Sequence, residues 1–383
     1  MIIRYLFSSP KGDIIIGPCE LSIPFKIAPS ESHPFLVLGD YFEAIKNFIL
    51  MNNGVPLVHV LGERLHRCIK IDSITKILIR TEKHGALYHL ASVEIFAVGQ
   101  RIKLAVSTAI SEIAKTFLAN EFDILKSFKR NFNFSYLPKA YYKDTIERAC
   151  GSKKEILSIM LTDWFEDYHE WHLSNDDDIK GQQICIWDLK NGRRFANKVE
   201  SFEIFRQTSK ILTLYYDTKD FRQIYPWHHA AGDFVVKTTG GITDVRITTA
   251  RNYEPIMVFL SENNINPMTA IIYYFLNLAL KIRLDKLNGV GKVVWAKGFS
   301  VEAATTGFFE ALRIMDDGDR YHLGKVGDLL LLLKAFTSKE IETLYYSMMD
   351  LYRLGDPEEF LSIQANLEDH VSRMHRILQA FRI

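Results

Sequence analysis

The chain has 383 residues and a mass of 44.2 kDa, a length that predicts two or three domains or lobes at about 150 residues each. Hydrophobic residues make up 48% and charged residues 24%, which excludes a largely disordered chain. Lys and Arg number 47 against 46 Asp and Glu, so no global basic excess points to a nucleic-acid-binding protein. The overall charge does not exclude a local basic patch.

The four cysteines lie far apart and form no CxxC pair, so neither a cysteine-based zinc site nor a thioredoxin motif is predicted. Sparse cysteine is typical of a reducing compartment. The residues MIIRYLFSSPKGD do not resemble a signal peptide, and the apolar stretch 268–282 is too short to span a membrane. We therefore expect a cytoplasmic protein that binds neither membrane nor nucleic acid, with 268–282 as a buried helix.

In chain order, residues 1–75 combine short β-like runs with one helical stretch over 41–51, and four prolines interrupt them. Because proline disrupts helix interiors and central strands, this part is predicted to be an irregular or edge-strand extension. Residues 76–81, 86–96 and 101–107 follow as three strands of an antiparallel meander, with Gly85 expected at positive φ in the first turn. A helix is predicted over 111–128 because its apolar residues recur at helical spacing.

Beyond Gly151 the pattern changes to a short strand over 156–161 and then mainly helices. A helix is predicted over 202–216. Thr337 with Glu340 forms a capping box that opens another helix, and Asp356-Pro357 opens the last one. The sequence thus predicts an α+β protein with a β-rich part before a helical part.

The segment 226–236, PWHHAAGDFVV, carries the densest set of chemically useful side chains. His228, His229 and Asp233 lie on one loop, and loops on a rigid scaffold often hold functional residues. Asp233 could accept a proton from a hydroxyl nucleophile, or it could be a structural loop cap. The two histidines could act in catalysis, or they could be a structural pair packed by Trp227.

Three other patterns in the sequence contain groups that could bind an ion. His169-Glu-Trp-His172 would place two histidines on one helical face, more in keeping with a polar rim than with a metal site. Asp176–Asp178 is predicted to be a solvated turn, because the spacing of a calcium-binding loop is absent. Arg246 and Arg251 could bind an anion or form salt bridges.

The order of these elements resembles the protein-kinase-like superfamily, in particular its aminoglycoside and choline phosphotransferase branch. The three strands and the helix with Asn120-Glu121-Phe-Asp-Ile-Leu125 resemble its small lobe, and 159–164 resembles its hinge. Ala231-Gly232-Asp233-Phe234 resembles its catalytic loop, and 244–249 resembles the strands that end at its metal-binding Asp. The resemblance implies a two-lobed fold with a small antiparallel-sheet N-lobe at 76–160, a larger helical C-lobe at 161–383 and an extra N-terminal extension at 1–75.

Several residues depart from that pattern. The first turn has Gly85 alone rather than a glycine-rich loop, and the family lysine is expected near 106–107, where only Lys103 is at hand. Thr238 stands where a metal-binding Asn is expected, and Thr248 stands near the position of the metal-binding Asp, with Asp244 the nearest carboxylate. Because phosphoryl transfer needs a Lys on the phosphates and oxygen ligands on Mg²⁺, the site is predicted to be degenerate.

The first hypothesis is accordingly a ligand-binding or regulatory module of kinase-like fold, a pseudokinase that could still hold a nucleotide or small molecule between its lobes. The alternative is an active ATP-dependent phosphotransferase on a small hydroxylated substrate. In it Asp233 is the base, helped by His228 and His229, Asp244 holds Mg²⁺, and Lys103, Glu121 and Gly85 bind the nucleotide. A second alternative is a scaffold that recruits a protein partner through residues 1–75.

Overall fold

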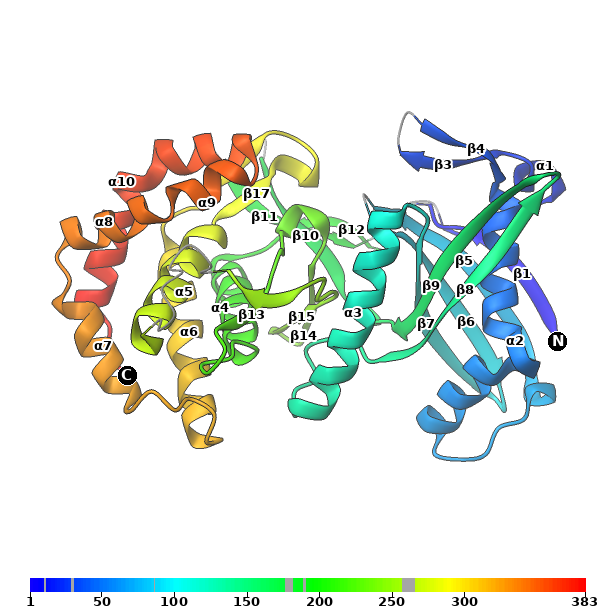
Figure 1. The fold of residues 1–383 in the computed structure, drawn as a ribbon, viewed down its shortest axis with the longest axis horizontal. Helices are drawn as coiled ribbons and strands as arrows, with labels where there is room; N and C mark the ends of the chain where they lie inside the picture. The colour runs from blue at the N-terminus through cyan, green and yellow to red at the C-terminus, as the bar shows by residue number, and fades with distance from the viewer. Residues whose placement is uncertain (10–11, 29–30, 86, 176–181, 189–190, 257–265) are drawn as a thin grey trace. The chain divides into compact units, whose positions relative to one another are not determined.

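A computed structural model describes residues 1–9, 12–28, 31–85, 87–175, 182–188, 191–256 and 266–383 (Figure 1). The chain divides into two compact units, residues 1–166 and 167–383. Both contain helices and strands, so the α+β class is confirmed. None of the helices in the described part of the chain is long and apolar enough to cross a membrane. The segment Asp176–Asp178 lies outside the described residues.

The first unit is built on a seven-stranded sheet with strand order β2-β1-β5-β6-β7-β9-β8. Its strands are β1 (Ile2–Phe7), β2 (Ile14–Ile15), β5 (Ile74–His84), β6 (His89–Ala97), β7 (Gln100–Ala109), β8 (Ala140–Cys150) and β9 (Lys153–Asp163). The other elements are α1 (Pro18–Leu21), the hairpin β3 (Pro24–Ala28) and β4 (Glu31–Val37), α2 (Leu38–Leu65), η1 (Ile71–Ser73) and α3 (Glu112–Asn131). The predicted meander is confirmed: β5, β6 and β7 are antiparallel neighbours.

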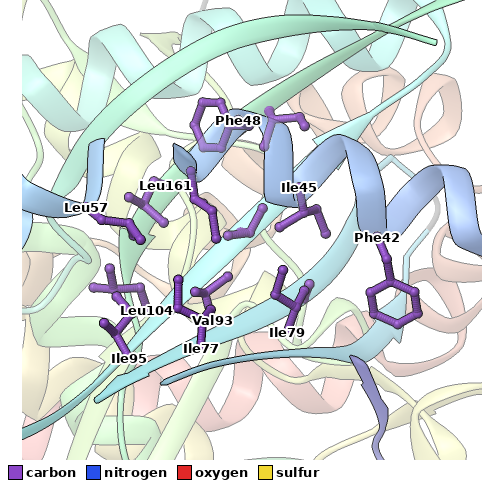
Figure 2. Packing of buried hydrophobic residues seen from close by; sticks show 14 of the residues in the cluster. Phe42, Ile45, Phe48, Leu57, Ile77, Ile79, Val93, Ile95, Leu104 and Leu161 are labelled. Carbon is purple, nitrogen blue, oxygen red and sulfur yellow. The ribbon is translucent and has the colours of Figure 1, made fainter. Parts of the chain in front are cut away.

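Helices cover both faces of this sheet. Side chains alternate between the faces of a strand, so Ile77 and Ile79 of β5 point to the same side as Val93 and Ile95 of β6 (Figure 2). There they pack against the buried side of α2. On the opposite face α3 packs against β7, β8 and β9. The face of β5, β6 and β7 that points away from α2 carries polar side chains, among them Arg80, Glu94 and Lys103.

Residues 1–75 include edge strands, as predicted, because β2 and β1 lie at one end of the seven-stranded sheet, but they are part of the first unit and not an extension to it. β1 joins the sheet as a parallel partner of β5, with Ile2 opposite Lys76 and Phe7 opposite Thr81. α2 supplies Phe42, Ile45 and Phe48 to the main core of the unit. Its backbone leaves helical geometry over 51–54, which accounts for the predicted end of the helix at 51.

The second unit combines a five-stranded sheet, of order β12-β11-β10-β14-β15, with most of the helices. The strands are β10 (His169–Asn175), β11 (Gln182–Asp188), β12 (Gly192–Phe195), β13 (Arg222–Ile224), β14 (Phe234–Thr239), β15 (Ile242–Ile247), β16 (Tyr253–Pro255), β17 (Leu284–Lys286) and β18 (Val293–Trp295). The helices are α4 (Lys198–Leu214), η2 (His229–Ala231), α5 (Pro267–Lys281), η4 (Leu287–Gly289), α6 (Phe299–Asp317), α7 (Val326–Ala335), α8 (Ser338–Ser347), α9 (Met349–Leu354) and α10 (Pro357–Ala380).

The first unit extends a few residues beyond the predicted boundary at 160/161, and the second unit, predicted to be mainly helical, also has strands in front of α4. β9 continues to Asp163, which pairs with Leu104 of β7, so residues 161–166 belong to the first unit. The second unit then opens with β10, β11 and β12, in front of its first long helix. Short strands with mixed polar and apolar residues over 169–195 gave too weak a period to be recognised as a sheet.

The helices with strong local signals lie where they were predicted. α5 is buried along nearly its whole length, as expected for 268–282. The Thr337 hydroxyl accepts the N–H of Glu340 at 3.3 Å and the Glu340 carboxylate accepts the N–H of Thr337 at 2.8 Å, which confirms the capping box. Asp356 caps α10, whose first residue is Pro357.

Candidate functional site

The loop between β13 and β14 carries Asp233 into the interior of the second unit. One 3₁₀ turn, η2, is followed by Gly232 at φ +73°, in the left-handed region that favours glycine. This turn reverses the chain just before β14, and the carbonyl of Asp233 accepts the N–H of Thr248 at 2.8 Å. Asp233 is 1% exposed as a result.

Arg251 binds both oxygens of the Asp233 carboxylate. Its Nη2 donates to Oδ1 at 2.7 Å and its Nη1 donates to Oδ2 at 2.8 Å, a bidentate pair. The N–H of His228 donates a third hydrogen bond to Oδ2 at 2.9 Å. A carboxylate has about four lone-pair positions, so three are already used inside the protein. A general base needs a lone pair directed at the substrate hydroxyl, and this geometry favours the structural role instead.

Asp244 lies at the other end of the β14–β15 hairpin. Lys237 is opposite Asp244, whereas Phe234 is opposite Ile247. At about 3.4 Å per residue, Asp244 is about 10–14 Å along the strand from the level of Asp233. It accepts hydrogen bonds from the Tyr168 hydroxyl and from Arg246, whose Nη2 is 2.9 Å away. The two carboxylates predicted to act together are therefore separated, and each has an arginine.

Threonines occupy the positions where metal ligands were expected. Thr248 lies beside Asp233 and its hydroxyl is 3.2 Å from the carbonyl of Gly232. Thr238 donates its hydroxyl to Glu200 at 2.5 Å. Over the described ranges, no three His, Cys, Asp or Glu side chains come together in a way that could hold a metal ion. The predicted magnesium role of Asp244 thus lacks a second carboxylate.

His228 lies in a half-buried cluster with the ion pair of Glu359 and Lys281. Its Nδ1 accepts the N–H of Ala230 at 2.9 Å, and its Nε2 is 2.6 Å from the Glu359 carboxylate. Lys281 of α5 pairs with the other carboxylate oxygen. Burial raises the pKa of Glu359, but the His228 hydrogen bond and the Lys281 charge outweigh burial and hold this pKa at about 2. A cavity of about 180 Å³ beside the cluster is lined by Trp227 and Tyr352, among others.

The low pKa of Glu359 predicts an acid-sensitive contribution to stability. Because the folded-state pKa of about 2 lies below the ordinary value of 4.5, this contribution is complete above pH 4.5 and is lost as the pH falls towards 2. We expect Glu359→Gln to remove about 2–3 kcal/mol of pH-dependent stability across that window. Urea unfolding at a series of pH values measures it. Glu358→Gln, at an exposed neighbour on α10, is the control. Parallel pH profiles for both variants would contradict the prediction.

His229 points into an aromatic core instead of a site. Its ring is 4.3 Å from that of Trp171 and 5.7 Å from those of Trp227 and Phe234. The Nε2 atom is 3.0 Å from the carbonyl of Ile282. Burial lowers the pKa of His229 to about 4, so the ring is neutral at pH 7. This packing favours the structural alternative for His229, with Trp227 as a packing partner, over a catalytic role.

The segment with His169 and His172 is a strand, not a helix. Residues three apart on a strand point to opposite faces, so the two imidazoles do not share one. His172 is buried, with Nδ1 3.6 Å from Asp285, whereas His169 lies 3.6 Å from Asp188. Neither arrangement forms the predicted polar rim.

In the first unit, Lys103 belongs to a charged network on the α3-side face of the sheet. Its ammonium group is 3.1 Å from Glu82 of β5 and lies over the Trp164 ring, 3.9 Å from the centroid. Arg80 is 3.7 Å from both Glu82 and Glu94, and it pairs with Asp13. Burial lowers the pKa of Lys103, and the Glu82 charge opposes that shift. The ion-pair partner of Lys103 is thus a carboxylate of the same sheet.

Glu121 and Gly85 have different surroundings from those predicted. Glu121 is 2% exposed, on the buried side of α3 with Leu118 and Leu125. The described ion pair of Lys103 is with Glu82, so Lys103 and Glu121 do not form the pair of the active alternative. Gly85 does not have the positive φ that was predicted. A Cβ atom at this position would lie 3.0 Å from the carbonyl oxygen of Tyr88. Glycine is needed there for close approach within the turn.

Sequence reasoning missed the partners that decide these roles. Arg251 was considered as an anion ligand or a salt-bridge residue, and the structure shows the salt bridge. Glu359 and Lys281 are far from the loop in sequence and gave no local signal. Glu82 had one: it follows Arg80 on the same strand face, opposite a strand that carries Glu94.

Comparison with known proteins adds no assignment. No protein-family model matches the chain, and no curated protein matches it. The geometry of the two units is therefore the basis for a function.

Proposed function

We propose that this protein is a kinase-like module that does not transfer phosphate and that acts by binding a ligand or by regulating a partner. The observation that carries the proposal is the engagement of Asp233 by Arg251 and by the N–H of His228. A carboxylate with three internal hydrogen bonds, one of them from a backbone group that cannot move away independently, is poorly suited to take a proton from a substrate.

The order of elements supports the kinase-like part of the proposal. In the first unit a strand meander, β5 to β7, is followed by α3 and then by the β8–β9 hairpin. In the second unit α4 precedes the loop of Asp233, and the β14–β15 hairpin follows it. Two segments depart from the expected order: 159–163 of the segment likened to a hinge are part of β9, and the strands β10 to β12 precede α4.

The charges support the inactive part. Phosphoryl transfer depends on a lysine that contacts the phosphates and on carboxylate or amide ligands for Mg²⁺. Lys103 is paired with Glu82, and Asp244 is paired with Arg246. Thr248 stands beside Asp233, and Arg251 places a permanent cation there. The residues present do not fit a bound Mg²⁺ at Asp233, and no step is assigned to one.

Calorimetric titration of the full chain with ATP, with and without Mg²⁺, tests this function. We expect Mg²⁺ not to increase the affinity for ATP, because Asp233 and Asp244 are each already paired with an arginine. ATP turnover should equal that of Asp233→Asn within error. An active enzyme would instead show metal-dependent binding, and Asp233→Asn would lower its turnover by about 10²-fold or more. That result would establish the phosphotransferase alternative.

A further inference from the structure

α3 and β8 carry a compact group of cations whose charge the structure leaves mostly unbalanced. The segment 125–143 contains five Lys or Arg and no Asp or Glu, in a chain whose net charge is only +1. Four of the five, Lys126, Arg130, Lys139 and Lys143, are close together, and we call them the α3–β8 cation cluster. The cluster is part of the first unit and takes no part in the function proposed above.

Short contacts define the cluster. The ammonium groups of Lys126 and Lys143 both lie over the ring of Phe122, at 5.5 and 5.1 Å from its centroid. Arg130 is one turn after Lys126 and its Nε donates to the Lys126 carbonyl at 3.3 Å. Burial lowers the pKa of Lys126, and the charges of Lys139 and Arg130 lower it further, while the charge of Glu63 opposes this shift in part. These cations are therefore near enough to repel one another.

Few carboxylates balance these charges. Lys139 pairs with Glu63 of α2. Among the described residues, Lys126, Arg130 and Lys143 form no ion pair. Lys139 is thus the one member of the cluster with a carboxylate partner among the described ion pairs, and an anion that bridges the cluster would relieve the repulsion between its cations.

We propose that the α3–β8 cation cluster binds a small ligand with several closely spaced phosphates. Ammonium and guanidinium groups are the usual protein ligands of phosphate, and Arg130 can offer a planar fork of donors. One phosphate cannot reach four side chains on a helix and a strand, whereas a chain of linked phosphates can. The compactness of the cluster matches a small polyanion better than a long one.

The surroundings favour this ligand over a nucleic acid or a membrane. Single-stranded nucleic acids stack their bases on free aromatic rings, but Phe122 already carries two ammonium groups. Three nearby rings also contact one another: Phe134 lies between Phe132 and Tyr136, with a ring contact to each. In the described part of 115–145 no large apolar side chain is prominently exposed, so the cluster lacks the anchor of a membrane-binding surface.

Calorimetric titration with sodium tripolyphosphate tests the proposal. We expect tripolyphosphate to bind the full chain at least about tenfold more tightly than inorganic phosphate does, and binding should weaken as salt rises above about 0.1 M. The double variant Lys126→Gln/Lys143→Gln should weaken it by at least about tenfold. Its thermal midpoint should not fall, because it removes like charges.

Lys76→Gln is the matched control. Lys76 is also in the first unit and also lies over a phenylalanine ring, that of Phe96 at 5.0 Å, but it is outside the cluster. Equal weakening by Lys76→Gln and by either single cluster variant, Lys126→Gln or Lys143→Gln, would show general charge attraction and overturn the proposal. Absence of tripolyphosphate binding at low salt would overturn it as well. So would cluster-dependent binding of an oligothymidylate, or of phosphatidylcholine vesicles containing phosphatidylserine, in preference to tripolyphosphate.

Discussion

Replacing Arg251 by Met is expected to lower the free energy of unfolding of the second unit by about 3–5 kcal/mol. The substitution keeps much of the side-chain length but leaves the Asp233 carboxylate, 1% exposed, with the N–H of His228 as its one remaining described side-chain hydrogen bond. A buried charge without its partner costs far more than the intact pair contributes. Urea unfolding followed by tryptophan fluorescence measures the loss, since four of the five tryptophans belong to this unit.

Arg246→Met gives the matched control for that experiment. Arg246 also pairs with an aspartate on the same hairpin, but the Asp244 side chain is 38% exposed, so water can replace the arginine. The expected loss is below about 1 kcal/mol. Combining Arg251→Met with Asp233→Asn removes the buried charge and should recover part of the stability. Equal small losses for Arg251→Met and Arg246→Met would mean that Asp233 is not held as the structure shows.

Asp233→Asn on its own distinguishes the structural role of Asp233 from the catalytic one. If Asp233 is a structural residue, its replacement by Asn changes stability and leaves ATP turnover where it was. If it is a catalytic base, Asp233→Asn changes turnover by a far larger factor than it changes stability. Stability and turnover therefore have to be measured on the same protein preparations, because a loss of folded protein would otherwise imitate a loss of catalysis.

Local signals in the sequence predicted local structure well. The capping box at Thr337, the proline at the start of α10 and the apolar length of α5 each depend on neighbouring residues, so they could be recognised without knowledge of the fold. The meander of β5 to β7 was predictable for the same reason, because short turns join its strands. What these elements share is that their stabilising contacts lie within one or two turns of the chain.

Long-range pairing could not be predicted in this way. The parallel contact of β1 with β5 joins strands separated in sequence by the β3–β4 hairpin and the whole of α2, and nothing in the residues of β1 identifies its partner. Prolines in the first 75 residues pointed to edge strands, which fits the small β3–β4 sheet but hides the part that α2 has in the core. The site shows the same limit. Asp233 was recognisable from its loop, whereas its role depends on Arg251, which approaches after the β14–β15 hairpin.

Phe48→Ala tests whether residues 1–75 are part of the core of the first unit. Phe48 is fully buried in α2, belongs to the same hydrophobic core as Leu161 of the sheet, and has its ring centroid 5.9 Å from that of Tyr142 of β8. Removing a fully buried phenylalanine ring should cost about 3–5 kcal/mol, because the cavity closes only in part. Amide hydrogen exchange of β5, β6 and β7, measured by mass spectrometry, should become faster by the factor that corresponds to this loss of unfolding free energy.

The control is Ile113→Ala on α3, where the side chain is 68% exposed and its loss should leave the exchange rates unchanged. A separable extension would behave differently: Phe48→Ala would accelerate exchange in α2 alone, and β5 to β7 would keep their protection. The structure predicts the opposite, because Ile77, Ile79 and Val93 have α2 as the other half of their core. Loss of protection in strands distant in sequence from the substitution is therefore the result that identifies one cooperative unit.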